Sequence, residues 1–205
     1  MKNFLAVDTS CNYLTVVAVK QDTPYTVFLP DCAMQHSIKL MGAIEEALQK
    51  ADMRLEECDF FAAVVGAGSF TGIRIAISVM KGFALALDKP CLSVTSFDVA
   101  AYNALDAGKT LCLVDALHDC YYVCGYENGQ VIYPPAFCGE EEVLALLQEG
   151  YCLRACAPMP ILEKAPLTIV DPATGLYKAA IALSEKQAFG ELSALYVRKS
   201  SAERE

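Results

Sequence analysis

The first 30 residues contain three short apolar runs separated by polar residues. Phe4–Asp8 and Leu14–Lys20 are rich in aromatic and β-branched residues, which favour strands. Between them, Thr9 to Tyr13 include side chains that hydrogen-bond their own backbone in turns. Pro24–Leu29 predicts a third strand, and its proline favours a sheet edge.

Two longer segments have the helical period and are apolar on more than one face. In the segment 33–51, the main stripe consists of Ile38, Met41, Ile44, Leu48 and Ala51. A second strip beside it consists of Leu40, Ala43 and Ala47. In the helix predicted over Thr71–Leu87, the stripe that would dock on the sheet consists of Ile73, Ala76, Ile77, Met80, Phe83, Ala84 and Leu87. The second stripe of that helix consists of Ile75, Val79, Gly82 and Ala86.

A helix that is apolar around most of its circumference is covered on both sides. We predict that another chain covers the second strips of the two helices, which would together present a two-helix interface. The alternative is that the C-terminal segment of the same chain covers them.

Three further elements complete the first half of the chain. Phe60–Val65 and Pro90–Thr95 predict strands, and Phe97–Leu105 predicts a helix capped by Ser96. Three antiparallel strands thus come first, and crossover helices then lead to parallel strands. This is the order of the ribonuclease-H-like half-domain shared by actin, sugar kinases and Hsp70. The sequence therefore predicts an α/β protein with an actin/Hsp70-like (ribonuclease-H-like) fold, in which helices flank a mixed sheet.

The polar break Asp106–Lys109 predicts the start of a second unit. Beyond it, the predicted strands are Thr110–Ala116, Cys120–Glu127, Gln130–Tyr133 and Tyr151–Cys156. The predicted helices are Glu140–Gln148 and Thr174–Lys186, and a proline-spaced loop precedes the second of them. Asn128-Gly129 is a strong hairpin signal. This pattern predicts a smaller, degenerate repeat of the first half. We expect a first domain over 1–106, completed by the segment 188–205, and a second domain over 107–187.

Charge and composition narrow the classes of function. The 205-residue chain has a formal net charge of −9; an acidic surface repels nucleic acid, so an RNA role needs a partner that supplies positive charge. The sequence contains no run of about 18 uncharged apolar residues, which argues against a transmembrane helix. Asp8 falls where a signal peptide needs apolar residues. We therefore expect a cytoplasmic protein whose ten scattered cysteines are small hydrophobes rather than disulfides.

The glycine loop Gly66–Gly72 is the main candidate for chemistry, because a strand, a glycine turn and a helix N-terminus can bind phosphate. It lacks the Walker A lysine, and its third glycine falls one residue late for G-x-G-x-x-G. The simpler interpretation is a tight turn in which Ser69 or Thr71 caps the helix. Arg74, one turn further on, could meet an anion or pair with a carboxylate.

Aspartates at two predicted strand ends suggest a second kind of site. Asp8 and Asp115 across a cleft would suit a magnesium–nucleotide complex, although Asp8 suits an Asx-turn equally well. The weak candidates for cofactor binding are Asp8, Ser10, Gly68, Ser69 and Asp115.

The histidines and cysteines do not predict a metal site. His118 with Cys120 and Cys124, or Cys152 with Cys156, lacks the spacing of a zinc ligand pair. Cys120 and Cys124 share a strand face and more simply pack in a core. We predict neither a metal site nor a catalytic residue.

Several segments resemble the TsaB (YeaZ) family in order and spacing. They are FLAVDTS at 4–10, QHSIKLMGAIEEAL at 35–48, GAGSFTGIR at 66–74, SVTSFDVAA at 93–101, LVDALHDCYYVCGYENG at 113–129 and ALYVRKSSAE at 194–203. The chain departs from the family pattern at Ala67, where the family usually has proline, and in its short second half.

The resemblance implies a non-catalytic subunit in the biosynthesis of threonylcarbamoyladenosine in tRNA. Such proteins pair with a catalytic TsaD paralogue and with the ATPase TsaE, so that ATP and metal belong to the partners and tRNA is reached only through the complex. Family members also form weaker homodimers through helices that match 35–50 and 71–87 here. The expected interface residues are Leu40, Ala43, Ala47, Ile75, Val79, Gly82 and Ala86. The chain has no histidine pair after Ser96, which agrees with a subunit that is not an enzyme on its own.

Two alternatives belong to other classes. A stand-alone small-molecule kinase or ATPase would use Asp8, Asp115 and the glycine loop, and would bind nucleotide with magnesium. A metallopeptidase would contain zinc.

Overall fold

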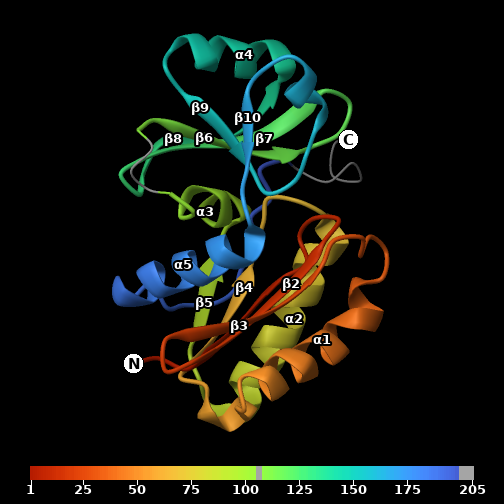
Figure 1. Ribbon diagram of the computed structural model, residues 1–205, viewed down its shortest axis with the longest axis vertical. Coiled ribbons are helices and arrows are strands. Elements are labelled where there is room, and N and C mark those ends of the chain that lie inside the picture. Colours follow the sequence, from red (N-terminus) through yellow and green to blue (C-terminus); the bar gives the residue numbers. More distant parts are fainter. Residues whose placement is uncertain (105–107, 199–205) are drawn as a thin grey trace.

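The computed structural model describes residues 1–104 and 108–198, and their strands form two five-stranded sheets (Figure 1). The first sheet has the order β3-β2-β1-β4-β5. Its strands are β1 (Phe4–Asp8), β2 (Leu14–Lys20), β3 (Thr23–Leu29), β4 (Phe60–Val64) and β5 (Cys91–Val94). Strands β1 to β3 are antiparallel, whereas β4 and β5 run parallel to β1. The predicted mixed sheet is confirmed.

Helices cover both faces of this sheet. Helices α1 (His36–Lys50) and α2 (Phe70–Leu87) cover one face, and α5 (Pro172–Glu185) covers the other (Figure 1). Because successive residues of a strand point to opposite faces, Leu5 packs with α1 and α2, while Phe4 packs on the side of α5. Every residue of β1 is buried, as expected for a strand covered on both faces.

The second sheet repeats the strand order of the first. Its strands are β6 (Thr110–Asp115), β7 (Cys120–Glu127), β8 (Gln130–Gly139), β9 (Cys152–Ala155) and β10 (Leu167–Ile169), with α4 (Glu140–Gln148) before β9. The order β10-β9-β6-β7-β8 places each strand where its counterpart lies in the first sheet. A short 3-10 turn, Pro160–Glu163, stands between β9 and β10, where α2 stands between β4 and β5. Strand β10 lies in the segment predicted to be a loop, and its three residues are too few for a periodic signal.

The two halves exchange their last helices. Helix α3 (Ser96–Ala101) follows β5 but packs on the second sheet, and α5 follows β10 but packs on the first. The prediction that 107–187 forms the second domain is therefore wrong for α5, whose Leu176 and Ala180 belong to the first core. Helical periodicity shows that one face is covered, not which sheet covers it. The predicted cap of α3 is also wrong, because Thr95 rather than Ser96 accepts from the Asp98 N–H.

The segment after α5 returns to the first sheet. Phe189 forms a bridge with Leu92, and the Leu195 N–H donates to the Val65 carbonyl at 2.7 Å. Leu192 is buried in the first core. The end of the predicted segment 188–205, from 199 onward, and the boundary at 106/107 lie outside the described residues.

The buried faces of α1 differ from the prediction. Leu40, Ala43 and Ala47 are buried against the sheet, so the expectation that they form an exposed partner interface is wrong. Ile38, predicted as core, is 80% exposed, and Met41 is 44% exposed. The two strips are neighbours on the helix, and the short alanines let the backbone approach the sheet closely, a preference that periodicity does not report.

Helix α2 packs on the sheet through Ile73, Ala76, Met80 and Ala84. By length and composition it is also the one helix in the described ranges that could cross a membrane, although only 28% of that window is buried. Its inner face lies in the core of the first half, which is the position of a core helix. Its outer face is apolar and uncovered.

Candidate functional site

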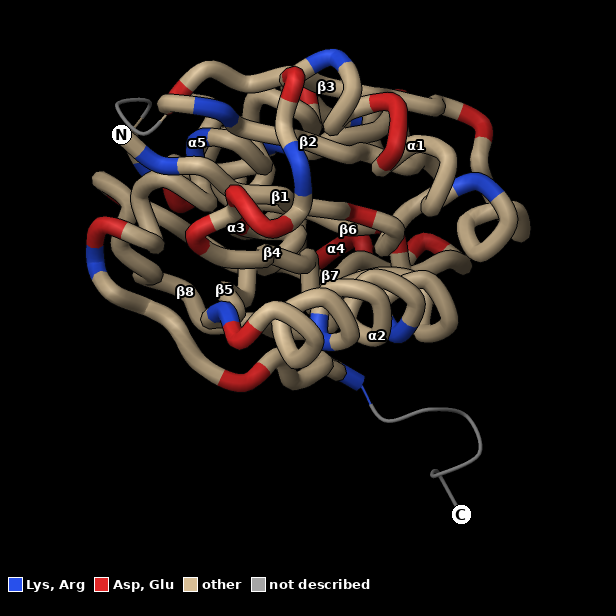
Figure 2. Tube along the Cα trace, turned by 90° about the horizontal axis from the view of Figure 1, so that it is seen from below, with Lys and Arg blue, Asp and Glu red and all other residues tan. Residues whose placement is uncertain are grey.

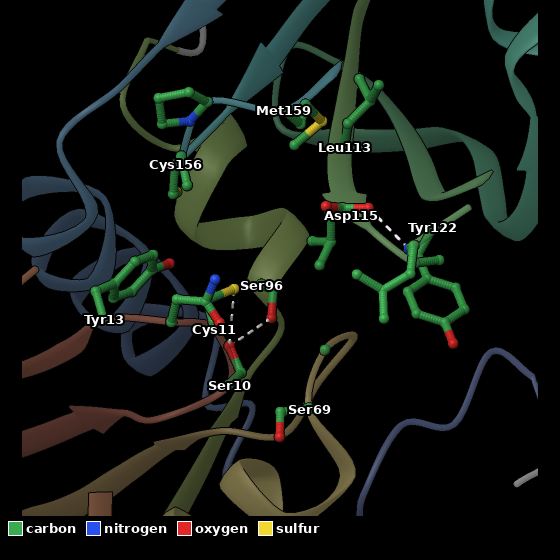
Figure 3. Close-up of a pocket in the computed structure, with 17 residues that line it drawn as sticks. Ser10, Cys11, Tyr13, Ser69, Ser96, Leu113, Asp115, Tyr122, Cys156 and Met159 are labelled. Atoms are coloured by element: carbon green, nitrogen blue, oxygen red, sulfur yellow. Dashed lines mark hydrogen bonds between the residues drawn. The ribbon is translucent and has the colours of Figure 1, made fainter. Parts of the chain in front are cut away.

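A cleft with a volume of 310 Å³ lies between the two sheets (Figure 3). The β1–β2 turn, the glycine loop and the start of α3 line it from one side, and the end of β6 and the segment after β9 line it from the other. Four of the five weak cofactor candidates line this cleft: Ser10, Gly68, Ser69 and Asp115. The fifth, Asp8, is fully buried and lies outside the lining.

Asp8 forms a buried Asx-turn rather than an open metal ligand. Its Oδ1 accepts from the Ser10 N–H at 2.8 Å and from the Ser10 hydroxyl at 2.7 Å, while its Oδ2 has no partner among the described residues. Burial raises the pKa of the Asp8 carboxyl, and the bonds from Ser10 offset this only in part. A carboxyl that favours its neutral form is a poor ligand for Mg²⁺.

Two serine hydroxyls connect Asp8 to the glycine loop. Ser10 Oγ lies 3.1 Å from Ser96 Oγ (Figure 3). Ser96 Oγ in turn donates to the Ala67 carbonyl at 2.5 Å. The Ser10 hydroxyl thus lies between Asp8 and Ser96, and it donates to the Asp8 carboxyl. Burial, with Oδ2 unpartnered among the described residues, is therefore what favours the protonated carboxyl.

Substitution of Asp8 by asparagine tests this assignment. As the pH rises above 3.8, the ordinary pKa of Asp, the Asp8 carboxyl loses its proton in the unfolded chain but keeps it in the folded one. The free energy of unfolding of the wild type therefore decreases with rising pH until the raised pKa of the folded state is reached. The asparagine side chain cannot titrate, so the stability of Asp8→Asn relative to the wild type should increase between pH 4 and pH 7. Urea unfolding at several pH values measures this difference. The exposed Asp31→Asn provides the control, and an equal pH trend in both variants would contradict the assignment.

The glycine loop is filled by the chain's own backbone. A Cβ on Gly68 would lie 2.2 Å from the Ser10 carbonyl oxygen, and a Cβ on Gly72 would lie 1.9 Å from the Thr9 carbonyl oxygen. The Ser69 N–H donates to the Ser10 carbonyl at 2.7 Å. Of the two predicted caps, Ser69 is the N-cap and accepts from the Gly72 N–H. The glycines therefore allow the β1–β2 turn to pack closely on the loop, which agrees with the simpler interpretation of a tight turn and a capped helix.

The electrostatics of the cleft do not suit a nucleotide. None of the described residues that line it is Lys or Arg, and its one acidic side chain is Asp115, whose Oδ1 accepts from the Leu117 N–H at 2.8 Å. Burial raises the pKa of the Cys11 thiol to about 12, so this side chain is neutral. Phosphates need cations or convergent N–H groups. The residues therefore do not fit the nucleotide that an actin-like fold implies.

The histidines and the strand cysteines have other partners in the structure. His36 is buried and its Nε2 lies 2.9 Å from the Tyr13 carbonyl, whereas His118 is exposed in the β6–β7 turn. Cys124 is buried and donates to the Tyr133 carbonyl. Within residues 1–104 and 108–198, no group of three His, Cys, Asp or Glu side chains could hold a metal ion.

A second concave surface lies between α1 and α2, with a volume of 530 Å³. We call it the helix groove; its lining residues are Ser37, Leu40, Met41, Phe70, Thr71, Arg74, Ile75, Ser78 and Val79. Of the predicted interface residues, Ile75 and Val79 line the groove and Leu40 is buried at its floor. Gly82 and Ala86 lie further along α2, and both are exposed.

Other exposed apolar residues of α1 and α2 are not among the predicted interface residues. They are Ile38, Met41, Phe70 and Leu85. The helical spacing predicts Ile38 and Met41 on one stripe with Ile44, which is buried. The two apolar strips of α1 are adjacent, and helical spacing alone does not show which of them packs on the sheet and which faces outward.

Two mixed sheets of the same order, exchanged helices and an intervening cleft define the actin/Hsp70-like class. The family model described as "TsaD: tRNA N6-adenosine threonylcarbamoyltransferase" matches residues 16–203. The chain therefore belongs to this family, and the relatives it resembles include proteins described as TsaB.

Two curated relatives carry the description "tRNA threonylcarbamoyladenosine biosynthesis protein TsaB". The one from Buchnera aphidicola subsp. Schizaphis graminum is 31% identical over 100 residues, 49% of this chain and 47% of the relative. The one from Bacillus subtilis is 31% identical over 99 residues, 48% and 43% of the two chains. The chain thus spans about half the length of the curated relatives it matches.

A solved structure from Pseudomonas aeruginosa covers nearly the whole fold. It is described as an uncharacterized protein with similarity to peptidase YEAZ, and it superposes with a TM-score of 0.83 and 24% identity. The match covers 97% of this chain and 100% of the other. At this identity the likeness concerns the fold, and it includes both sheets.

Proposed function

We propose that the chain is a non-catalytic subunit in threonylcarbamoyladenosine biosynthesis, which docks a TsaD-type catalytic paralogue. In this proposal a TsaE-type ATPase joins the complex, the partners supply ATP and metal, and tRNA is bound only by the assembly. The descriptions of the TsaB relatives support the pathway. The lack of Lys and Arg among the described residues that line the cleft supports a subunit that binds no nucleotide of its own.

The uncovered apolar face of α1 and α2 is the observation that carries the proposal. Ile38 is 80% exposed and Leu85 is 87% exposed. No acidic residue lies within α2, and most of its tube is uncharged in Figure 2. An apolar groove between two helices, continued by exposed apolar residues, is the surface that a partner covers. Alone, the chain would pair with a second copy through the same face.

Charge insertion at the groove tests the docking. Val79→Glu places a carboxylate in the apolar lining, and desolvation of this charge should weaken binding of the TsaD-type partner at least about 100-fold. Gly82→Arg should act similarly through size and charge. The matched control is Val131→Glu, because Val131 is 54% exposed on β8 of the other half. Light scattering after size exclusion measures the complex.

Three measurements separate this proposal from its rivals. A complex lost in Val79→Glu, kept in Val131→Glu and active in tRNA modification only with all components supports the scaffold. A complex unchanged in Val79→Glu rejects the assigned face. Magnesium-dependent nucleotide binding by the isolated chain would favour the kinase or ATPase instead.

A further inference from the structure

Arg74 is the one charged residue among those that line the helix groove. We propose that Arg74 binds a carboxylate on the docking helix of the TsaD-type partner, and thereby favours that partner over a second copy of this chain. The inference rests on the proposed function. The apolar lining would bind either occupant, and the charge of Arg74 would distinguish the partner from a second copy.

The guanidinium of Arg74 is held in place before any partner binds. Its Cζ lies 3.8 Å from the centre of the Phe70 ring, and its Nε–H donates to the Tyr196 hydroxyl at 3.0 Å. Phe70 and Tyr196 in turn stack with their centroids 4.8 Å apart. An arginine fixed by stacking and by its Nε loses little conformational freedom on binding. Its two terminal NH2 groups stay available for a bidentate carboxylate.

No carboxylate in the described part of the chain forms an ion pair with Arg74. The neighbouring cation on the same helix, Lys81, pairs with Glu191 at 2.8 Å. The whole chain has 25 acidic and 16 basic residues, so acidic groups are not scarce. An arginine held by aromatic rings at an apolar groove, without an acid, is complementary to a negative group from outside.

The composition of the groove distinguishes the two possible occupants. A symmetric pair of identical chains presents the same patch from both sides, and this lining contains hydroxyls and apolar groups but no carboxylate. A second copy would bring two guanidinium groups into one interface and no counter-ion. The fitting occupant is an amphipathic helix of the paralogue, with apolar residues over Met41, Ile75 and Val79 and an Asp or Glu that reaches Arg74.

The test compares hetero-association and self-association in the same variants. Arg74→Gln removes the charge but keeps a polar side chain, and it should weaken binding of the TsaD-type partner about 10- to 100-fold. Self-association, measured by sedimentation, should be unchanged or stronger. Arg74→Lys keeps the charge without the bidentate geometry and should lie between. Lys81→Gln on the same helix is the matched control and should bind as the wild type does.

Salt gives an independent readout. The affinity of the wild type should fall as ionic strength rises, more steeply than that of Arg74→Gln. If Val79→Glu abolishes the complex while Arg74→Gln binds normally, the role of Arg74 is overturned and the docking face stands. If neither variant affects the complex, the docking face itself is wrong. A parallel loss of self-association in Arg74→Gln would overturn the selectivity.

Discussion

Replacement of Gly72 by alanine is expected to destabilise the protein by at least about 3 kcal/mol, or to prevent folding. The new Cβ would lie 1.9 Å from the Thr9 carbonyl oxygen and 3.0 Å from its carbonyl carbon. Neither group can withdraw, because Thr9 is fully buried and its hydroxyl donates to the Gly72 carbonyl at 2.7 Å. The clash is therefore between two backbones that are fixed to each other.

Gly82 provides a control on the same helix. Nothing lies within 4 Å of a Cβ at this position, and alanine is a better helix former than glycine by about 0.5–1 kcal/mol. Gly82→Ala should therefore stabilise the fold slightly, whereas Gly72→Ala should have the opposite and larger effect. Urea unfolding followed by circular dichroism measures both. Equal effects at the two positions would show that helix propensity, rather than close packing, decides the role of Gly72.

Strong periodic signals gave reliable elements. Phe4–Asp8, Leu14–Lys20, Cys120–Glu127 and Glu140–Gln148 have the predicted bounds. Strand β10 and the last residues of β8 were missed, because three residues carry no period and the prolines at 134 and 135 argue against a strand. The exchange of α3 and α5 was also missed, since it depends on long-range packing that local patterns do not encode.

The candidate cleft was predicted in part for a topological reason. Turns at the ends of β1 and β6, and the loop after β4, meet at the same edge in a doubled fold, so Ser10, Ser69 and Asp115 come together. The burial of Asp8 could not be predicted, because it depends on how closely the glycine loop packs on the turn. The same packing places the Ser10 and Thr9 carbonyls against Gly68 and Gly72.

Replacement of Arg154 by methionine is expected to cost about 2–4 kcal/mol and to loosen the contact between the two halves. Arg154 lies on β9 and is only 6% exposed. Its Nη1 donates to the carbonyls of Ala101 at 3.3 Å and Ala104 at 2.8 Å, at the end of α3. Methionine fills a similar volume without a donor, so the loss reports these bonds and the interaction of the cation with the helix C-terminus.

The effect should be specific to this buried arginine. Arg54→Met is the control, because the Arg54 side chain is 80% exposed and pairs with nearby Glu57. Such an exposed pair contributes about 0–1 kcal/mol. Urea unfolding gives both stabilities, and limited proteolysis reports whether the two halves separate. Because α3 comes from the first half and β9 from the second, Arg154 joins the halves where the exchanged helix ends. Stability within about 0.5 kcal/mol of the wild type in Arg154→Met would show instead that apolar packing of α3 alone holds the two halves together.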